Sequence, residues 1–243
     1  MALPTQSTVP YALAQRPPGS DSAGFPFRCR AAPMYIPASF AETRPAALHA
    51  LVRAHPLGML VTSGPHGLDA NHLPFWLDDS ATPAGRLVAH VARANPVWQQ
   101  ADGAEVMVVF RGPQAYISPS WYPSKHETHR LVPTWNYEVV HAHGRLTVHD
   151  DARFVRQVMA RLTHAHEAAE PQPWKMGDLA PGALEPLVQA VVGIAVNITR
   201  LEGKSKLSQN RSARDIAGAV EALRVRGQNE LASAMAQAAP PQP

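Results

Sequence analysis

The sequence contains a single cysteine, Cys29, in 243 residues. One thiol excludes a disulfide framework within the chain and a cysteine-rich zinc site. A chain of this length buries enough surface to fold without such crosslinks. The scarcity of cysteine is typical of a reducing compartment, and we expect a cytoplasmic protein.

Long apolar runs are also missing, although hydrophobic residues make up 45% of the chain. No window approaches the roughly 18 consecutive apolar residues that a membrane span needs. The first residues lack the basic region and apolar run of a secretory signal. We therefore expect no membrane association.

Glycine-rich phosphate motifs and a G-x-S-x-G motif are absent as well. Their absence excludes the Rossmann and P-loop classes and leaves nucleophilic catalysis without support. The formal net charge of +3 is too small to indicate nucleic-acid binding by itself. No helix-turn-helix is predicted, so the sequence gives no support for DNA as a binding partner.

Six prolines and little apolar periodicity mark residues 1–33, which predicts a disordered leader. Residues 239–243 are predicted to be a disordered tail. One domain is expected over residues 34–238, and Met34 is a candidate for the natural start.

Short β-rich runs bounded by turn signals fill most of that domain. Strands are predicted over residues 57–63, 68–77, 86–92, 105–111, 114–118, 134–143, 145–149 and 191–201, and helices over 43–56, 96–100, 152–168 and 212–226. Gly112-Pro113 is expected to form a tight turn, and Gly144 either bends one long strand or turns a hairpin. The pattern predicts a mainly β fold with peripheral helices, such as a closed or split antiparallel barrel.

Two polar segments are candidate binding sites. In the first predicted hairpin, Thr62 and Ser63 converge with Asn71 and His72 if the strands pair, although a solvated hairpin edge would carry the same residues. In the second, HVARANP, His90 precedes a loop with Arg93 and a helix beginning near Asn95. A guanidinium beside free backbone N–H groups suits a phosphate. An ordinary N-cap and a surface arginine are the alternative.

Two further segments are open to similar alternatives. Aromatic residues between 118 and 137 suit the stacking of a flat ring, a subunit interface or the filling of a barrel end. The polar segment 203–212 is predicted to be a loop that either holds an anionic ligand or a partner subunit, or is simply solvated. Histidine is frequent, and His141 and His143 share a strand face, but no established ligand spacing occurs. We expect solvated histidines and no metal.

Several phrases together resemble the PaiB-like family of FMN-binding negative transcriptional regulators. They are MYIPASF, GMLVTSG, NHLPF, HVARANPVW, VFRGPQAYISPSWY, VPTWNY and VVGIAVNITRLEGKSKLSQNRS, in the same order over residues 34–235. The resemblance implies an FMN-binding split β-barrel and a homodimer with FMN in a groove between the subunits. The loop between Trp121 and Val132 departs from the family pattern by being longer than expected.

The resemblance also implies roles for individual residues. Arg93 and Asn95 would bind the phosphate, with Thr62 and Ser63 nearby. The groove beside the flavin ring would be lined by Asn71, His72 and His90. Trp135 and Asn136 would come from the facing region, and the site would be closed by Lys206, Gln209 and Asn210. Lys206 is the candidate for stabilising reduced flavin, because a cation near the pyrimidine edge favours its negative charge.

A dimeric flavin-dependent regulator or sensor is the function that the resemblance implies. An FMN-dependent oxidoreductase or flavin reductase is one alternative, because a flavin performs hydride chemistry without a protein acid–base pair. A haem-binding protein of the same fold is another, with His72 or His90 as the ligand. No catalytic residue is identified.

Overall fold

The computed structural model describes residues 34–65, 67–81 and 84–239. The predicted leader, residues 1–33, lies outside the described residues, as does all of the predicted tail except its first residue. The contacts from Met34 onward make one compact unit.

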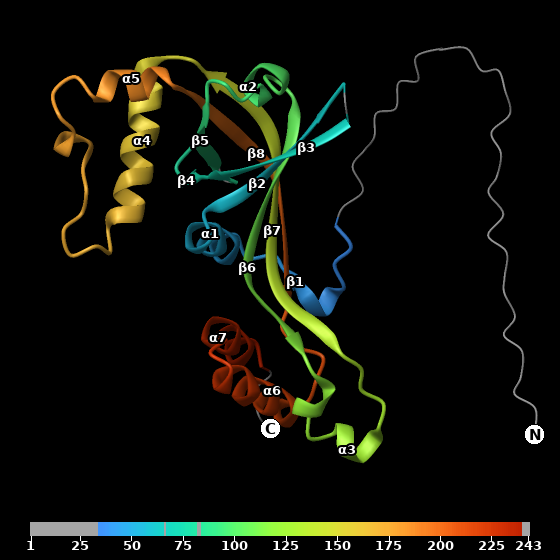
Figure 1. The fold of residues 1–243 in the computed structure, drawn as a ribbon. Coiled ribbons are helices and arrows are strands. Elements are labelled where there is room, and N and C mark those ends of the chain that lie inside the picture. Colours follow the sequence, from blue (N-terminus) through green and yellow to red (C-terminus); the bar gives the residue numbers. More distant parts are fainter. Residues whose placement is uncertain (1–33, 66, 82–83, 240–243) are drawn as a thin grey trace, which may run out of the picture. The chain divides into compact units, whose positions relative to one another are not determined.

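Strands and short or long helices follow one another along this unit (Figure 1). The strands are β1 (Ala41–Glu42), β2 (Leu57–Gly64), β3 (Gly67–Pro74), β4 (Trp76–Asp78), β5 (Arg86–Ala92), β6 (Glu105–Ile117), β7 (Thr134–His149) and β8 (Val191–Lys206). The α-helices are α1 (Pro45–Ala54), α2 (Val97–Gln100), α3 (Lys125–Thr128), α4 (Ala152–Glu167), α5 (Leu184–Gln189), α6 (Ala213–Val225) and α7 (Asn229–Ala238), and 3-10 turns span Ala38–Phe40, Pro119–Trp121 and Met176–Asp178.

One antiparallel sheet contains all of these strands, in the order β3-β2-β6-β7-β8-β5-β4, with β1 beside β8. Strands β7 and β8 are each 16 residues long and pair along most of their length. The fold is a split β-barrel with peripheral helices, and the fold class predicted from the sequence is confirmed.

Alternation along the strands builds the barrel core. In β2, Gly58, Leu60 and Thr62 are buried, whereas the residues between them are only half-buried. Side chains of successive strand residues point to opposite faces, so one face of each strand supplies the core. Helix α1 closes this core with Leu48 and Val52.

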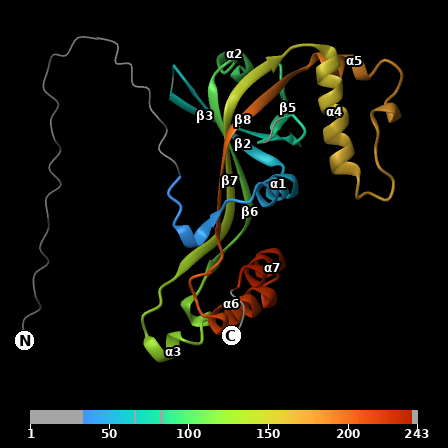
Figure 2. The same ribbon diagram turned by 180° about the vertical axis from the view of Figure 1, so that it is seen from behind.

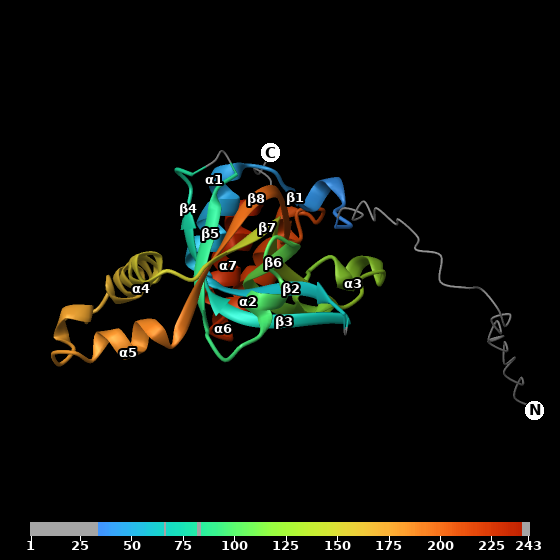
Figure 3. The ribbon, with the colours of Figure 1, turned by 90° about the horizontal axis from the view of Figure 1, so that it is seen from above.

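Other helices pack at separate places on the sheet. Val158 and Leu162 of α4 pack against Val88 and Ala195 on the outer face of β5 and β8. Helices α6 and α7 form a second apolar cluster near the far ends of β6, β7 and β8 (Figure 2). Seen from above, α4 and α5 lie on one side of the barrel and α3 on another (Figure 3).

Three local predictions differ from the structure. Gly112-Pro113 is no turn, because β6 continues through it with a register shift between Arg111 and Gln114. Residues 203–206 belong to β8 rather than to a loop. The predicted strand 68–77 is divided at Phe75 into β3 and β4.

The structure also resolves the alternatives at Gly144, which lies within the continuous strand β7 at a register shift. A Cβ atom at this position would lie 2.2 Å from the Asn197 carbonyl oxygen. Glycine is therefore required for β8 to pass so close.

Within the described ranges, none of the helices combines the length and the apolar character that crossing a bilayer requires.

Candidate functional site

Polar side chains join the first hairpin to the loop after β5. The side-chain amide of Asn95 donates to Asn71 Oδ1 at 2.7 Å, and Asn71 in turn donates to Asp69 Oδ2 at 2.8 Å. Asn95 Oδ1 also accepts the backbone N–H of Val97 at 2.9 Å. Asn95, just before the Pro96 N-cap of α2, therefore satisfies the first backbone N–H of the helix and at the same time links two segments of the predicted site.

An open cavity of about 260 Å³ lies beside these residues. Thr62 and Ser63 line it from β2, Asp69 from β3 and Gln100 from α2. Ser63 lines this cavity too, but as the neighbour of Thr62 in β2 its side chain leaves the opposite face of the strand. We call Thr62, Asn71 and Asn95 the barrel-end group. It offers hydroxyl and amide groups, which suit the polar parts of a phosphorylated ligand.

His72 does not join this group, contrary to the prediction that it converges with Asn71. The two are consecutive residues of β3, so their side chains leave opposite faces of the strand. His72 is exposed and stands opposite Met59 of β2.

Arg93 is not free to bind a phosphate in the way that the sequence predicts, because it is already paired with a carboxylate. Its guanidinium donates to both carboxylate oxygens of Asp150, at 3.0 and 2.6 Å, and to the backbone oxygens of Gln189 and Val191. The hydrogen bond from Arg93 lowers the pKa of Asp150 below its ordinary value. This contact crosslinks the segments beside α4 and α5 to the barrel, so a phosphate must displace Asp150 to form a bidentate contact with the guanidinium.

His90 lies under α4 rather than beside the barrel-end group. It shares a strand face with Val88, which packs in the cluster that contains Val158 of α4. Its Nδ1 atom is buried without a hydrogen-bond partner among the described residues. Burial lowers the pKa of His90, so the ring is neutral at pH 7. Within one chain His90 therefore does not join Asn71, and its place in a groove between subunits stays a prediction.

The remaining predicted residues form a distal group at the far end of the sheet: Trp135, Asn136, Lys206, Gln209 and Asn210. The Lys206 ammonium donates to the Trp135 backbone oxygen at 2.9 Å. Gln209 bonds back to its own segment through the Leu207 N–H and the Ser205 oxygen. Trp135 is 55% exposed and Asn210 is exposed, so both are available to another molecule.

Asn136 is the exception in the distal group. Its side chain is fully buried and donates to Ser208 Oγ at 2.8 Å and to the sulfur of Met235. A cofactor cannot contact Asn136 while α7 covers it, so its predicted binding role does not fit this structure.

The strand registers separate the barrel-end group from the distal group. Asn71 pairs with Leu60 of β2, which is level with Val108 of β6 and Ala142 of β7. Trp135 lies seven residues before Ala142 in β7, which is roughly 23 Å along the strand at about 3.3 Å per residue, and β2 and β6 lie between β3 and β7. One FMN molecule cannot contact both groups of the same chain.

Comparison with protein families now adds to this geometry. Residues 34–200 match the family described as "Putative FMN-binding domain". The chain belongs to this family. FMN is its cofactor, and the PaiB-like resemblance is confirmed.

Individual relatives agree with this assignment. An uncharacterized protein of Aspergillus fumigatus is 33% identical over 234 residues, covering 77% of this chain and 90% of that protein. The protease synthase and sporulation protein PAI 2 of Bacillus subtilis is 32% identical over 194 residues, covering 78% of this chain and 89% of that protein. Among solved structures, the flavocytochrome Anf3 from Azotobacter vinelandii shares the fold, with a TM-score of 0.53 and 13% identity over 68% of this chain and 69% of that one.

Sequence reasoning missed other candidate residues. Asp69 and Gln100 line the barrel-end cavity, but only strand pairing and the position of α2 bring them there. A larger cavity of about 550 Å³ lies between α1, β7, β8 and α7 and contains none of the predicted site residues. Its polar lining, which includes Glu42, Glu138 and Lys204, comes from segments that no local motif connects.

Proposed function

We propose that this chain works as a homodimer that binds FMN between its subunits and acts as a flavin-dependent regulator or sensor. The separation of the barrel-end group from the distal group carries the proposal. In a two-fold dimer, the distal group of one subunit can meet the barrel-end group of the other, and the symmetry creates two equal sites. FMN, when bound, supplies electron and hydride transfer.

The chemistry of each group supports a shared site. The barrel-end cavity of about 260 Å³ is below the roughly 300–1,000 Å³ of typical small-molecule pockets. One chain therefore encloses only part of a ligand as large as FMN. The exposed Trp135 ring, which packs edge-on against Tyr116 at 6.3 Å, offers a flat apolar surface for the rest.

Mixing two defective variants tests the shared site. Asn71→Ala impairs the barrel-end group and Trp135→Ala the distal group, so each variant alone should lose FMN. After subunit exchange at equal concentrations, half of the dimers are mixed and hold one intact site, so about a quarter of wild-type FMN binding should return. Flavin fluorescence titration, with the molar mass measured by light scattering, provides the readout.

A matched mixture controls for this effect. Asn71→Ala with Thr62→Ala combines two defects of the same group, and no mixed dimer then holds an intact site. Recovery in this control, no recovery with Trp135→Ala, or a monomeric protein that binds FMN fully would each contradict the shared site.

We propose that Arg93 binds the FMN phosphate and that Asp150 competes with the phosphate for the guanidinium. Asp150→Asn should therefore tighten FMN binding a few-fold, because the guanidinium no longer has a carboxylate partner. Glu185→Gln is the control, since it breaks the nearby exposed pair with Arg156 and leaves Arg93 untouched. If Asp150→Asn leaves the dissociation constant unchanged or weakens binding, Arg93 acts only as a structural crosslink.

The regulatory role is supported by the sporulation function that the name of the Bacillus subtilis relative gives for that protein. Direct DNA reading by the α6–α7 pair is not favoured. Helix α7 has no Lys or Arg, and its Glu230 contacts His55, after α1, at 3.0 Å. We expect the flavin redox state to change the binding of a target.

Steady-state assays separate the regulator from the alternative enzyme. A regulator should oxidise NADPH no faster than free FMN at the same concentration. Sustained, protein-dependent NADPH oxidation with an added acceptor would instead favour an FMN-dependent oxidoreductase.

A further inference from the structure

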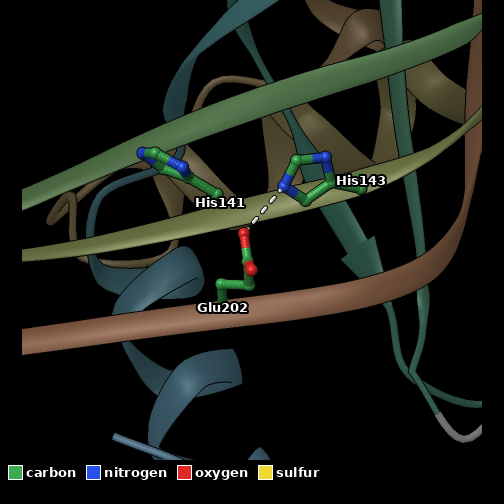
Figure 4. Close-up of side chains that lie close together, drawn as sticks. All are labelled: His141, His143 and Glu202. Atoms are coloured by element: carbon green, nitrogen blue, oxygen red, sulfur yellow. Dashed lines mark hydrogen bonds and ion pairs between the residues drawn. The ribbon is translucent and has the colours of Figure 1, made fainter. Parts of the chain in front are cut away.

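Two histidines and a glutamate gather on one face of the long strands β7 and β8. His141 and His143 are two residues apart in β7, so their side chains leave the same face of the strand. Glu202 is the direct partner of His141 across the β7–β8 pair. One ligand atom from each residue lies within 4.8 Å of the other two (Figure 4).

An ion pair accounts for only part of this arrangement. Glu202 Oε2 lies 3.0 Å from His143 Nε2, while Oε1 contacts Arg200 and accepts the Met34 N–H. No hydrogen bond to the His141 ring is found in the part of the chain that the structure describes. That ring stands edge-on to His143, with 6.4 Å between the ring centres. An imidazole without a partner beside a carboxylate and a second imidazole is free to bind a further ligand.

The surroundings hold the cluster in place but leave it accessible. The side chain of His143 is 19% exposed and that of Glu202 is 10% exposed. Their backbones belong to paired central strands of the sheet. Ligands on rigid elements keep their relative positions better than ligands on loops.

We propose that His141, His143 and Glu202 bind a divalent first-row transition-metal ion such as Zn²⁺. Two imidazole nitrogens and one carboxylate oxygen are a donor set that zinc accepts, and three protein ligands leave a position for water. Bonds of about 2 Å place tetrahedral ligand atoms about 3.3 Å apart, so the side chains must close in by about 1.5 Å at most. Small torsional changes within rotamer wells supply such movements.

Arg200 is the competing partner within the site. Its guanidinium pairs with Glu202 and opposes a second cation by charge repulsion. The Arg200 side chain is 37% exposed, so it can turn towards solvent when an ion binds. Metal affinity should therefore depend on Arg200 in the opposite direction from its dependence on the three ligands.

Equilibrium dialysis of the full-length protein against Zn²⁺, followed by elemental analysis, tests the site directly. After stripping with a chelator, we expect one ion per chain that excess Mg²⁺ or Ca²⁺ does not displace, because those ions prefer oxygen ligands. His141→Gln, His143→Gln or Glu202→Gln should each weaken binding at least about tenfold. His126→Gln, on the exposed helix α3, is the control, because the chain has 12 histidines.

Arg200→Gln keeps the test informative if a ligand variant fails to fold. It removes only the competing charge, so zinc should bind several-fold more tightly. Unchanged zinc binding by Glu202→Gln, weaker binding by Arg200→Gln, or displacement by Mg²⁺ would each overturn the metal site. These measurements need no flavin, so their outcome is independent of the shared FMN site.

Discussion

The barrel core and the C-terminal cluster are two apolar regions built in different ways. In the barrel, Leu60, Phe110 and Leu146 are fully buried between strands that pair edge to edge. In the C-terminal cluster, α6 and α7 pack on Ile117 and Tyr122, and strand pairing does not hold these helices. The barrel core is continuous with the sheet, whereas the second region depends on contacts between separate segments.

Hydrogen bonds supply part of those contacts in the C-terminal cluster. Tyr122 Oη and Ser208 Oγ lie 2.9 Å apart, and Asn136 donates to the same Ser208. The backbone and hydroxyl of Ser124 donate to Asp215, in the first turn of α6, at 2.9 and 2.7 Å. Asn136, Asp215 and Ser208 are the most deeply buried polar side chains apart from tyrosine in the described ranges.

Two regions of one chain are thus stabilised differently, the barrel by apolar packing and the C-terminal cluster also by buried hydrogen bonds. Apolar packing is not directional, so the barrel resists small polar changes around it. Buried polar groups stabilise a structure only when their partners are in place, and they cost free energy when a partner is lost. Loss of apolar volume should therefore destabilise the barrel most, whereas loss of a polar partner should destabilise the C-terminal cluster.

The largest effect is expected from Phe110→Ala in the barrel core. The Phe110 ring is fully buried and meets Phe75 edge-on at 5.8 Å. Removing it should lower the free energy of unfolding by about 3–5 kcal/mol, measured by urea denaturation. Val225→Ala, on an exposed residue of α6, is the control and should change little. A loss as small as that of the control would show that the ring does not support the barrel.

An intermediate effect is expected from Asp215→Asn in the C-terminal cluster. The variant exchanges a charged acceptor of the Ser124 hydrogen bonds for a neutral amide. We expect a loss of about 1.5–3 kcal/mol at pH 7. Hydrogen exchange should report it first in α6 and α7, with the barrel strands less affected. Equal loss of protection in β6 to β8 would contradict the distinction between the two regions.

The pH dependence sharpens the same experiment. Burial by itself raises the pKa of Asp215, but hydrogen bonds from Ser124 and Ser212 lower it by more, so the pKa lies below its ordinary value. A carboxyl group whose pKa is lower in the folded state stabilises the protein above its unfolded pKa, and this contribution is lost as the pH falls through the folded pKa. The difference in stability between wild type and Asp215→Asn should therefore narrow below about pH 4. A constant difference across this range would contradict the role of the charge.

The smallest effect is expected from Tyr122→Phe. This variant keeps the buried ring and removes only the hydroxyl that contacts Ser208. A neutral hydrogen bond contributes about 0.5–1.5 kcal/mol, so the loss should lie in that range. Thermal unfolding followed by tryptophan fluorescence, with Trp121 in the same cluster, provides the measurement. A loss comparable to that of Phe110→Ala would mean that both regions depend equally on polar contacts.

Local patterns predicted the fold well and the candidate site only in part. Apolar alternation and turn residues located most strands, and the family phrases identified the cofactor. Asn71 and Asn95, which the sequence places in two separate candidate segments, are joined by a hydrogen bond. His72 and His90 do not join them, because strand alternation and the position of α4 direct them elsewhere.

The sequence alone determined the alternation of the strands and the membership of an FMN-binding family. These properties depend on residues that are close together in the chain. Only the tertiary structure decided that Arg93 contacts Asp150, that Asn136 is buried beneath α7, and that Glu202 faces two histidines. Such contacts depend on strand register and helix packing, which bring together residues that no local pattern connects.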